Sequence, residues 1–112
     1  MTEKYSVLVV LCNAPDEGTA KMLASALIER ELAACVNLLA PASSCYRWQG
    51  TLETTTEIPM LIKTTAARYA ALEAVLHELH PYDLPEIIAL PVAAGLPAYL
   101  GWVQDATGGP SA

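Results

Sequence analysis

The stretch Ser6-Val7-Leu8-Val9-Val10-Leu11-Cys12-Asn13-Ala14-Pro15-Asp16-Glu17 contains the change of pattern that decides the fold. Its first seven residues form a continuous apolar run rich in β-branched side chains, which is typical of a strand buried on both faces. A proline and two acidic residues follow. They favour the first turn of a helix, because proline suits that turn and carboxylates interact well with the positive end of the helix dipole. The stretch therefore predicts a strand that leads directly into a helix.

Downstream of this stretch the sequence alternates between helical and extended patterns. Apolar residues first recur three or four positions apart, which predicts an amphipathic helix, at Ala20, Leu23, Ala24, Leu27 and Ile28. Further strands are expected at residues 34–39, 45–48, 51–65 and 87–90. A second helix is expected to end at His80, because Pro81 disfavours helical geometry at the residue before it. A short helix is expected at 98–106, followed by a disordered tail at 107–112.

Two signals concern the long run 51–65. Gln49-Gly50 lies immediately before it and predicts a hairpin turn. Pro59 lies inside it and cannot donate a hydrogen bond to a neighbouring strand. The strand is therefore expected to lie at a sheet edge, or to be bulged, at Pro59.

The order strand, helix, strand, strand, helix, strand predicts a single α+β domain over residues 1–112. Right-handed crossovers and a central hairpin make it a ferredoxin-like sandwich with a C-terminal helix, in which the helices cover one face of an antiparallel sheet. The other face has no covering layer, although its strands are apolar on both sides. Charged residues make up 16% of the chain, against about 25% in typical soluble domains. Both features predict that another subunit covers the open face.

The charge balance excludes several classes of partner. Six Lys and Arg against twelve Asp and Glu give a net charge of −6, which opposes binding to nucleic acids and to anionic membranes. The runs 6–12 and 51–65 also lack the stacking aromatics of an RNA-recognition sheet. No apolar run is long enough for a signal peptide or a membrane span. We therefore expect a cytoplasmic protein whose cysteines, Cys12, Cys35 and Cys45, are free thiols.

Two groups of side chains could carry function. His77 and His80 are three residues apart at a helix end, and Cys12 and Glu86 could lie near them, a donor set that suits copper or zinc. The alternative is that the two histidines are solvated or cap the last carbonyl groups of the helix. The second group is aromatic and could anchor a subunit interface or pack within the chain. It comprises Tyr46, Trp48, Tyr82, Tyr99 and Trp102.

Taken together, several runs resemble the CutA family of divalent-cation-tolerance proteins over roughly residues 5–106. The most specific are Ala33-Ala34-Cys35-Val36-Asn37 and His80-Pro81-Tyr82-Asp83-Leu84-Pro85-Glu86. The others are Leu11 to Glu17, Tyr46-Arg47-Trp48-Gln49-Gly50, Lys63-Thr64-Thr65 and Tyr99-Leu100-Gly101-Trp102. The resemblance implies a cytoplasmic homotrimer without enzymatic activity, linked to tolerance of copper and other divalent cations. It also implies that long strands pair between subunits.

The resemblance gives the metal hypothesis its residues. Copper-binding members use the cysteine that closes the first strand, which matches Cys12, and a histidine pair before Pro-Tyr, which here is Leu79-His80. We expect Cys12, His80 and Glu86 to be ligands, with His77 the weakest candidate and copper bound more tightly than zinc. Tyr46, Trp48, Tyr82 and Trp102 are expected at subunit interfaces. The alternative function is that of a sensor similar to the trimeric PII proteins, with a small molecule in the cleft between subunits.

Overall fold

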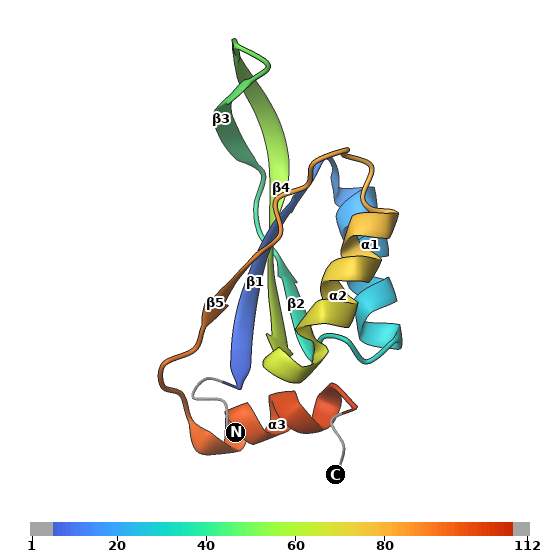
Figure 1. The fold of residues 1–112 in the computed structure, drawn as a ribbon, viewed down its shortest axis with the longest axis vertical. Coiled ribbons are helices and arrows are strands. Elements are labelled where there is room, and N and C mark those ends of the chain that lie inside the picture. Colours follow the sequence, from blue (N-terminus) through green and yellow to red (C-terminus); the bar gives the residue numbers. More distant parts are fainter. Residues whose placement is uncertain (1–5, 109–112) are drawn as a thin grey trace.

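The computed structural model describes residues 6–108 as a five-stranded sheet with three helices (Figure 1). The elements are β1 (Val7–Ala14), α1 (Glu17–Glu29), β2 (Cys35–Leu38), β3 (Ala42–Trp48), β4 (Thr51–Thr65), α2 (Ala66–Leu79), β5 (Ile88–Pro91) and α3 (Pro97–Ala106). The predicted elements are all present, and β4 has the predicted limits. No helix within residues 6–108 is long and apolar enough to cross a membrane.

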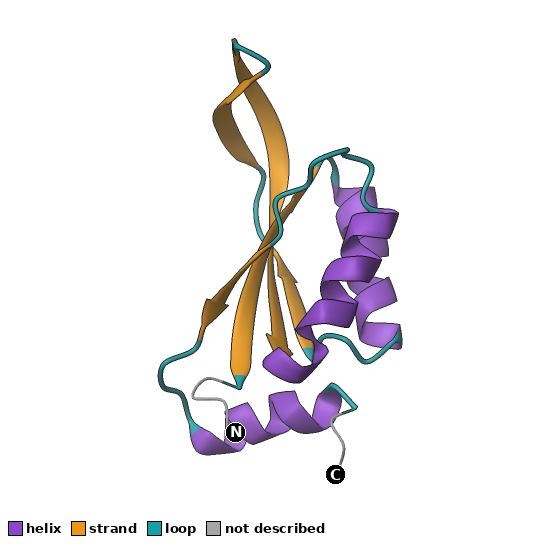
Figure 2. Ribbon diagram, viewed as in Figure 1, coloured by secondary structure: helices purple, strands orange, loops and turns teal. Residues whose placement is uncertain are grey.

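Strand β4 is the centre of the sheet. The strand order is β2-β4-β1-β5 and every neighbouring pair is antiparallel, with β3 pairing with β4 beyond the end of β2. Helices α1 and α2 lie side by side on one face, as Figure 2 shows. This arrangement confirms the predicted ferredoxin-like fold, in which β2 and β3 together occupy the position of one long strand.

The position of Pro59 corrects the prediction of an edge strand. Pro59 lies in the central strand, opposite Asn13 of β1, and its carbonyl group accepts a hydrogen bond from the Leu39 N–H on the other side. In an extended strand the N–H and C=O of a residue point to the same side. The missing N–H of Pro59 therefore faces the break between β2 and β3, where no regular ladder requires it.

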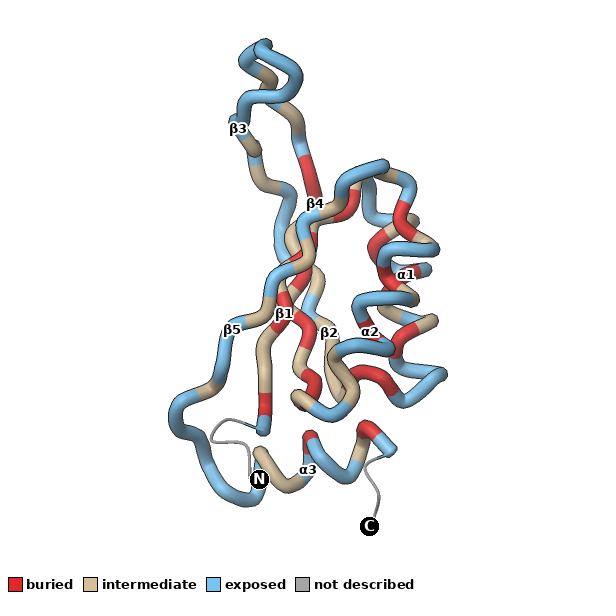
Figure 3. The backbone as a smooth tube through the Cα atoms, viewed as in Figure 1, coloured by how far each residue is buried: buried red, intermediate tan, exposed pale blue. Residues whose placement is uncertain are grey.

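The hydrophobic core lies between the sheet and the two long helices (Figure 3). Strands β1 and β4 contribute Val10, Cys12, Met60 and Ile62, and the helices contribute four leucines that are all at most 1% exposed, Leu23, Leu27, Leu72 and Leu76. In β1 and β4 these core residues alternate with half-buried residues that face the other side of the sheet. One side of the sheet is thus sealed by the chain itself.

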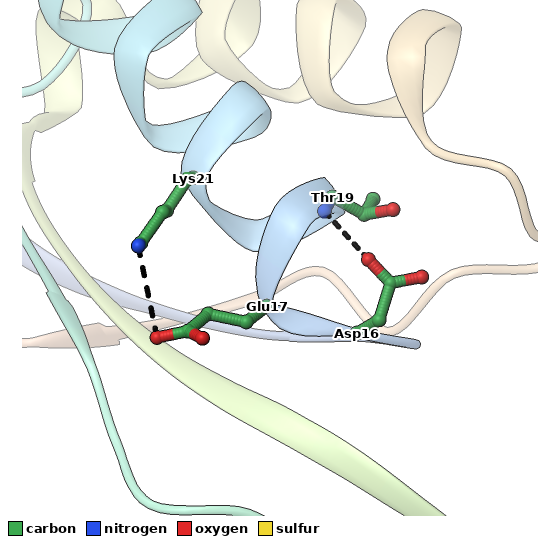
Figure 4. A network of polar contacts seen from close by, with 4 residues as sticks. All are labelled: Asp16, Glu17, Thr19 and Lys21. Atoms are coloured by element: carbon green, nitrogen blue, oxygen red, sulfur yellow. Dashed lines mark hydrogen bonds and ion pairs between the residues drawn. The ribbon is translucent and has the colours of Figure 1, made fainter.

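Helix α1 begins at Glu17, so Pro15 precedes the helix and does not lie in its first turn as the sequence pattern suggested. Asp16 is its N-cap and accepts a hydrogen bond from the Thr19 N–H at 2.7 Å (Figure 4). This bond holds the pKa of the Asp16 carboxyl below its ordinary value. Glu17 pairs with Lys21 one turn later. The cap fixes the point at which the chain turns from β1 onto the helical layer.

The opposite face of the sheet and the β3–β4 hairpin are open. On that face Val9 lies beside Leu90, and Leu11 lies between Leu61 and Ile88. Ile88 and Leu90 are each 50% exposed. The hairpin extends away from the helices along the 47 Å long axis of the molecule (Figure 1). Both surfaces therefore expose large apolar side chains that the chain does not cover, on the hairpin Tyr46, Trp48 and Leu52.

The prediction of a disordered tail at 107–112 is wrong for its first residue, Thr107. Thr107 is fully buried, and its hydroxyl donates to the carbonyl groups of Val103 and Gln104 at the end of α3. A threonine followed by two glycines is typical of an irregular chain end, so the sequence pattern did not predict these hydrogen bonds. Here the threonine hydroxyl caps the last turn of α3. Residues 109–112 lie outside the part of the chain that the structure describes.

Candidate functional site

Asn13, near the end of β1, is the centre of the candidate site. Its side-chain amide donates to Glu86 Oε1 at 3.0 Å, and its backbone carbonyl contacts His80 Nε2 at 2.7 Å. Cys12 precedes it in the chain. The strand end, the residue that terminates α2 and the loop before β5 therefore meet at one residue.

The hydrogen bonds of His80 fix its tautomer. Its Nδ1 accepts the Tyr82 N–H at 3.1 Å, so this nitrogen carries no proton. The proton is on Nε2, which donates to the Asn13 carbonyl group. His80 is 6% exposed and its ring packs against that of Tyr82 with centroids 4.8 Å apart. Both ring nitrogens are thus engaged within the chain.

Tyr82 extends this network to a second carboxylate. Its hydroxyl donates to Glu57 Oε2 at 2.9 Å. Burial, and then the neighbouring Glu57 carboxylate, raise the pKa of Tyr82 to about 12. A continuous chain of hydrogen bonds consequently runs from Glu86 through Asn13, His80 and Tyr82 to Glu57.

Cys12 lies on the helix side of the sheet. It is opposite Met60 in the register and is 1% exposed. Burial, with a further contribution from the negative charges of Glu86 and Glu57, raises the pKa of the Cys12 thiol to about 12. The thiol is therefore protonated at neutral pH and is not a nucleophile.

The predicted metal ligands are brought to one region but do not share a coordination point. Across residues 6–108, no group of three His, Cys, Asp or Glu side chains is placed to hold a metal ion. Cys12 is buried in the core, His80 is bonded through both nitrogens, and Glu86 is exposed and bonded to Asn13. His77 is exposed on α2, where the inward positions are Leu72 and Leu76, so it is separate from His80.

Beside this network the surface forms a cleft of about 710 Å³. The hairpin forms one wall, and the loop between α2 and β5 forms the other. The lining residues are Asn13, Ser44, Cys45, Tyr46, Trp48, Thr55, Glu57, Tyr82, Asp83, Leu84 and Glu86. Sequence reasoning missed Asn13 and Glu57, because no metal or catalytic motif includes them. The only signal in the sequence was that Asn13 directly follows the first apolar run and that Glu57 lies in the predicted long strand.

The aromatic residues divide into two sets. Trp48 and Tyr46 are exposed on the hairpin, and Trp102 is exposed on α3, where its ring packs against that of Tyr99. Tyr82 instead has its contacts within the chain, to His80 and Glu57. Tyr46, Trp48 and Trp102 are therefore not part of the core of the single chain, and their place at subunit interfaces stays a prediction.

Comparison with known proteins gives a consistent result. Residues 8–106 match the model of the family described as CutA1 divalent ion tolerance protein. The chain is 48% identical over 97 residues to the divalent-cation tolerance protein CutA of Pectobacterium atrosepticum, covering 87% of this chain and 88% of that protein.

Solved structures agree with the sequence match. The crystal structure of CutA from Xylella fastidiosa is similar with a TM-score of 0.89 and 45% identity, over 91% of this chain and 98% of that one. A protein of Archaeoglobus fulgidus, described as a periplasmic divalent cation tolerance protein CutA, is similar with a TM-score of 0.87 and 33% identity. That match covers 90% of this chain and 98% of the archaeal one.

Proposed function

Because the chain belongs to the CutA1 divalent ion tolerance family, we propose that it acts in tolerance of divalent cations by binding a transition metal ion. The ion proposed first is copper, with zinc the weaker candidate, and the protein acts as a homotrimer without catalysing a reaction. The observation that carries this proposal is the meeting of Cys12, His80 and Glu86 around Asn13. Imidazole and carboxylate donors with a nearby thiol suit copper.

Metal binding at this place requires a local rearrangement. His80 must give up one of its two hydrogen bonds before a ring nitrogen can bind a cation, and Cys12 must lose a proton that burial holds firmly. Glu86 is exposed and has one bond to break. We therefore propose that Glu86 and His80 make the first contacts with the metal, and that Cys12 contributes last.

Calorimetric titration of Cu(II) and of Zn(II) tests the metal proposal. We expect copper to bind more tightly than zinc, and we expect Glu86→Gln and His80→Ala each to weaken copper binding roughly tenfold or more. His77→Ala is the matched control, since it removes an exposed imidazole outside the network, and it should bind as the wild type does. Equal copper affinity in all four proteins would show that the site is elsewhere. Glu86→Gln keeps the test valid if His80→Ala does not fold.

The homotrimer is proposed from the surface of the single chain. The open sheet face exposes Ile88 and Leu90, and the hairpin exposes Trp48, Tyr46 and Leu52. Apolar area of this kind in a chain with few charges is typical of a subunit interface. We propose a cytoplasmic location on the ground that Cys12, Cys35 and Cys45 are free thiols. Cell fractionation tests the location, and a periplasmic protein would contradict it.

The cleft favours a second candidate function, that of a PII-like sensor which binds a small molecule between subunits. Its volume of about 710 Å³ is within the range of ligand pockets, about 300–1,000 Å³, and far exceeds the space that one ion needs. Native mass spectrometry of freshly purified protein separates the two functions. A stoichiometric metal ion supports the first function, and a co-purified organic molecule supports the second.

A further inference from the structure

The charge of the cleft is one-sided. Glu57, Asp83 and Glu86 line it, and none of its lining residues is lysine or arginine. The ion pair formed between described side chains, Lys21 with Glu17, lies on α1. Three carboxylates thus face one space with no cationic side chain in it. Bringing an anionic group into that space would be opposed by all three.

Glu57 supplies an independent indication of the kind of group this space could bind. It is 7% exposed, which is unusual for a carboxylate, and it lines the cleft. Its Oε2 accepts the Tyr82 hydroxyl, and its Oε1 has no hydrogen-bond or ion-pair partner among residues 6–108. A buried carboxylate is costly unless a cation or further donors compensate it. Among the described residues Tyr82 supplies one donor, and Oε1 is not one of the sealed side-chain atoms without a partner, so it remains accessible from the cleft.

The rest of the wall is aromatic and apolar. Tyr46, Trp48 and Leu84 line the cleft and are all more than two-fifths exposed. Aromatic faces next to carboxylates are the usual surroundings of organic cations, since the ring attracts positive charge and also covers an apolar body. A metal ion would use neither the aromatic wall nor most of the volume.

We propose that this cleft binds a small organic cation, a primary ammonium or guanidinium group joined to an apolar body. The cationic group pairs with Glu57, supported by Asp83, and the apolar body packs against Trp48, Tyr46 and Leu84. This inference deepens the second candidate function and rests on it. Nucleotides are not expected to bind in this cleft, because their phosphates would be repelled by the three carboxylates.

A set of probes of matched shape tests the charge requirement. The probes are 2-phenylethylamine, 2-phenylethanol and phenylacetate, which share a ring and a two-atom reach but are cationic, neutral and anionic. Binding is followed by calorimetry and by amide shifts of the residues that line the cleft. We expect the amine to bind with a Kd of about 1 mM or below, and the other two roughly tenfold more weakly or not at all.

Substitutions of Glu57 and Asp83 test whether these carboxylates hold the bound amine. Glu57→Gln preserves size and an acceptor for Tyr82, and Asp83→Asn changes an exposed loop residue. Each should weaken amine binding, Glu57→Gln by roughly tenfold. Glu78→Gln makes the same change of charge on an exposed position of α2 and should leave binding unchanged. Equal binding of the three probes, no binding of the amine, or unchanged binding in both cleft variants would overturn the inference.

The inference and the functions proposed above fail in different experiments. The metal function fails in the copper and zinc titrations, which contain no amine. The sensor function fails if native mass spectrometry releases no organic molecule. The organic-cation inference fails alone if a molecule is released and proves to be neutral or anionic.

Discussion

At the scale of single residues, Asn13 and Tyr82 hold the site together. Asn13 connects Glu86 to His80, and Tyr82 connects His80 to Glu57. Each uses both a backbone group and a side chain, so a change at either residue affects two elements at once. Glu57 and Glu86 are therefore positioned by the same network and not independently.

Tyr82→Phe tests how much this network stabilises the chain. The variant leaves the buried Glu57 carboxylate without its donor, so the free energy of unfolding should fall by about 1–2 kcal/mol near neutral pH. Tyr99→Phe is the matched control, because Tyr99 is exposed and its ring packs against that of Trp102. It should change stability by less than about 0.5 kcal/mol. Equal losses in the two variants would show that the Tyr82 hydroxyl bond contributes nothing.

The pH dependence of that difference has a defined sign. The pKa of Tyr82 is raised to about 12 in the folded chain, against about 10 for an unperturbed tyrosine. A raised pKa means that the folded state favours the protonated hydroxyl. The contribution is therefore complete below about pH 10 and is lost as the pH rises toward about 12. Urea unfolding of wild type and Tyr82→Phe should give curves that converge over this range.

Sequence reasoning located this region but not its internal contacts. Cys12, His80 and Glu86 were predicted to lie together because each follows or ends an element at one edge of the sheet, and they do surround Asn13. Their role as metal ligands stays a prediction. The direction in which Cys12 points depends on the register of β1 against β4, and the bonds of His80 depend on the backbone of Asn13. Neither can be obtained from residue spacing.

At the scale of elements, the hairpin turn and β4 were the most predictable parts of the chain. Gln49-Gly50 predicted the turn, and both residues adopt positive φ, 52° and 81°, as the two central positions of a type I′ turn require. The pairing of both β2 and β3 with β4 was not predictable, because residue patterns do not show how two segments share one neighbouring strand. Pro59 was consequently assigned to an edge or a bulge, although it lies in the central strand and in continuous register with β1.

Gly50→Ala tests the turn. A side chain at φ 81° is strained even though no atom lies close enough to clash, so we expect a loss of about 1 kcal/mol. Gly101→Ala is the matched control, since Gly101 lies inside α3 with open space around it. That change should stabilise the chain by about 0.5–1 kcal/mol, because alanine favours helix. Chemical denaturation of both variants measures the two shifts, and a loss in Gly101→Ala or none in Gly50→Ala would contradict this reading.

At the scale of the whole molecule, the shape of the single chain predicts assembly. The molecule measures 47 × 26 × 23 Å, and its length comes from the β3–β4 hairpin, which extends beyond the helical layer (Figure 1). Sedimentation equilibrium should give three times the 11.9 kDa of one chain. A mass near that of a single chain at micromolar concentration would contradict the trimer.

Trp48→Ala tests the place of the hairpin in that assembly. The side chain is 43% exposed in the single chain, and its loss should raise the concentration at which the trimer dissociates by roughly tenfold or more if it is an interface anchor. Met22→Ala removes a side chain of similar exposure, 45%, from α1, and should leave the dissociation concentration as in the wild type. An unchanged trimer in Trp48→Ala would place the interface elsewhere.

Strand β4 passes through two environments, and amide hydrogen exchange should record the change within one strand. Met60 to Lys63 are paired with β1 on one side and β2 on the other, whereas Thr51 to Thr56 are paired with β3 alone. The inner amides should exchange only on global unfolding, and the outer ones by local opening. The boundary falls beside Pro59, which has no amide hydrogen and so gives no signal of its own. In a trimer the outer amides should become protected while the inner ones stay as they are, which makes their exchange a direct measure of subunit contact.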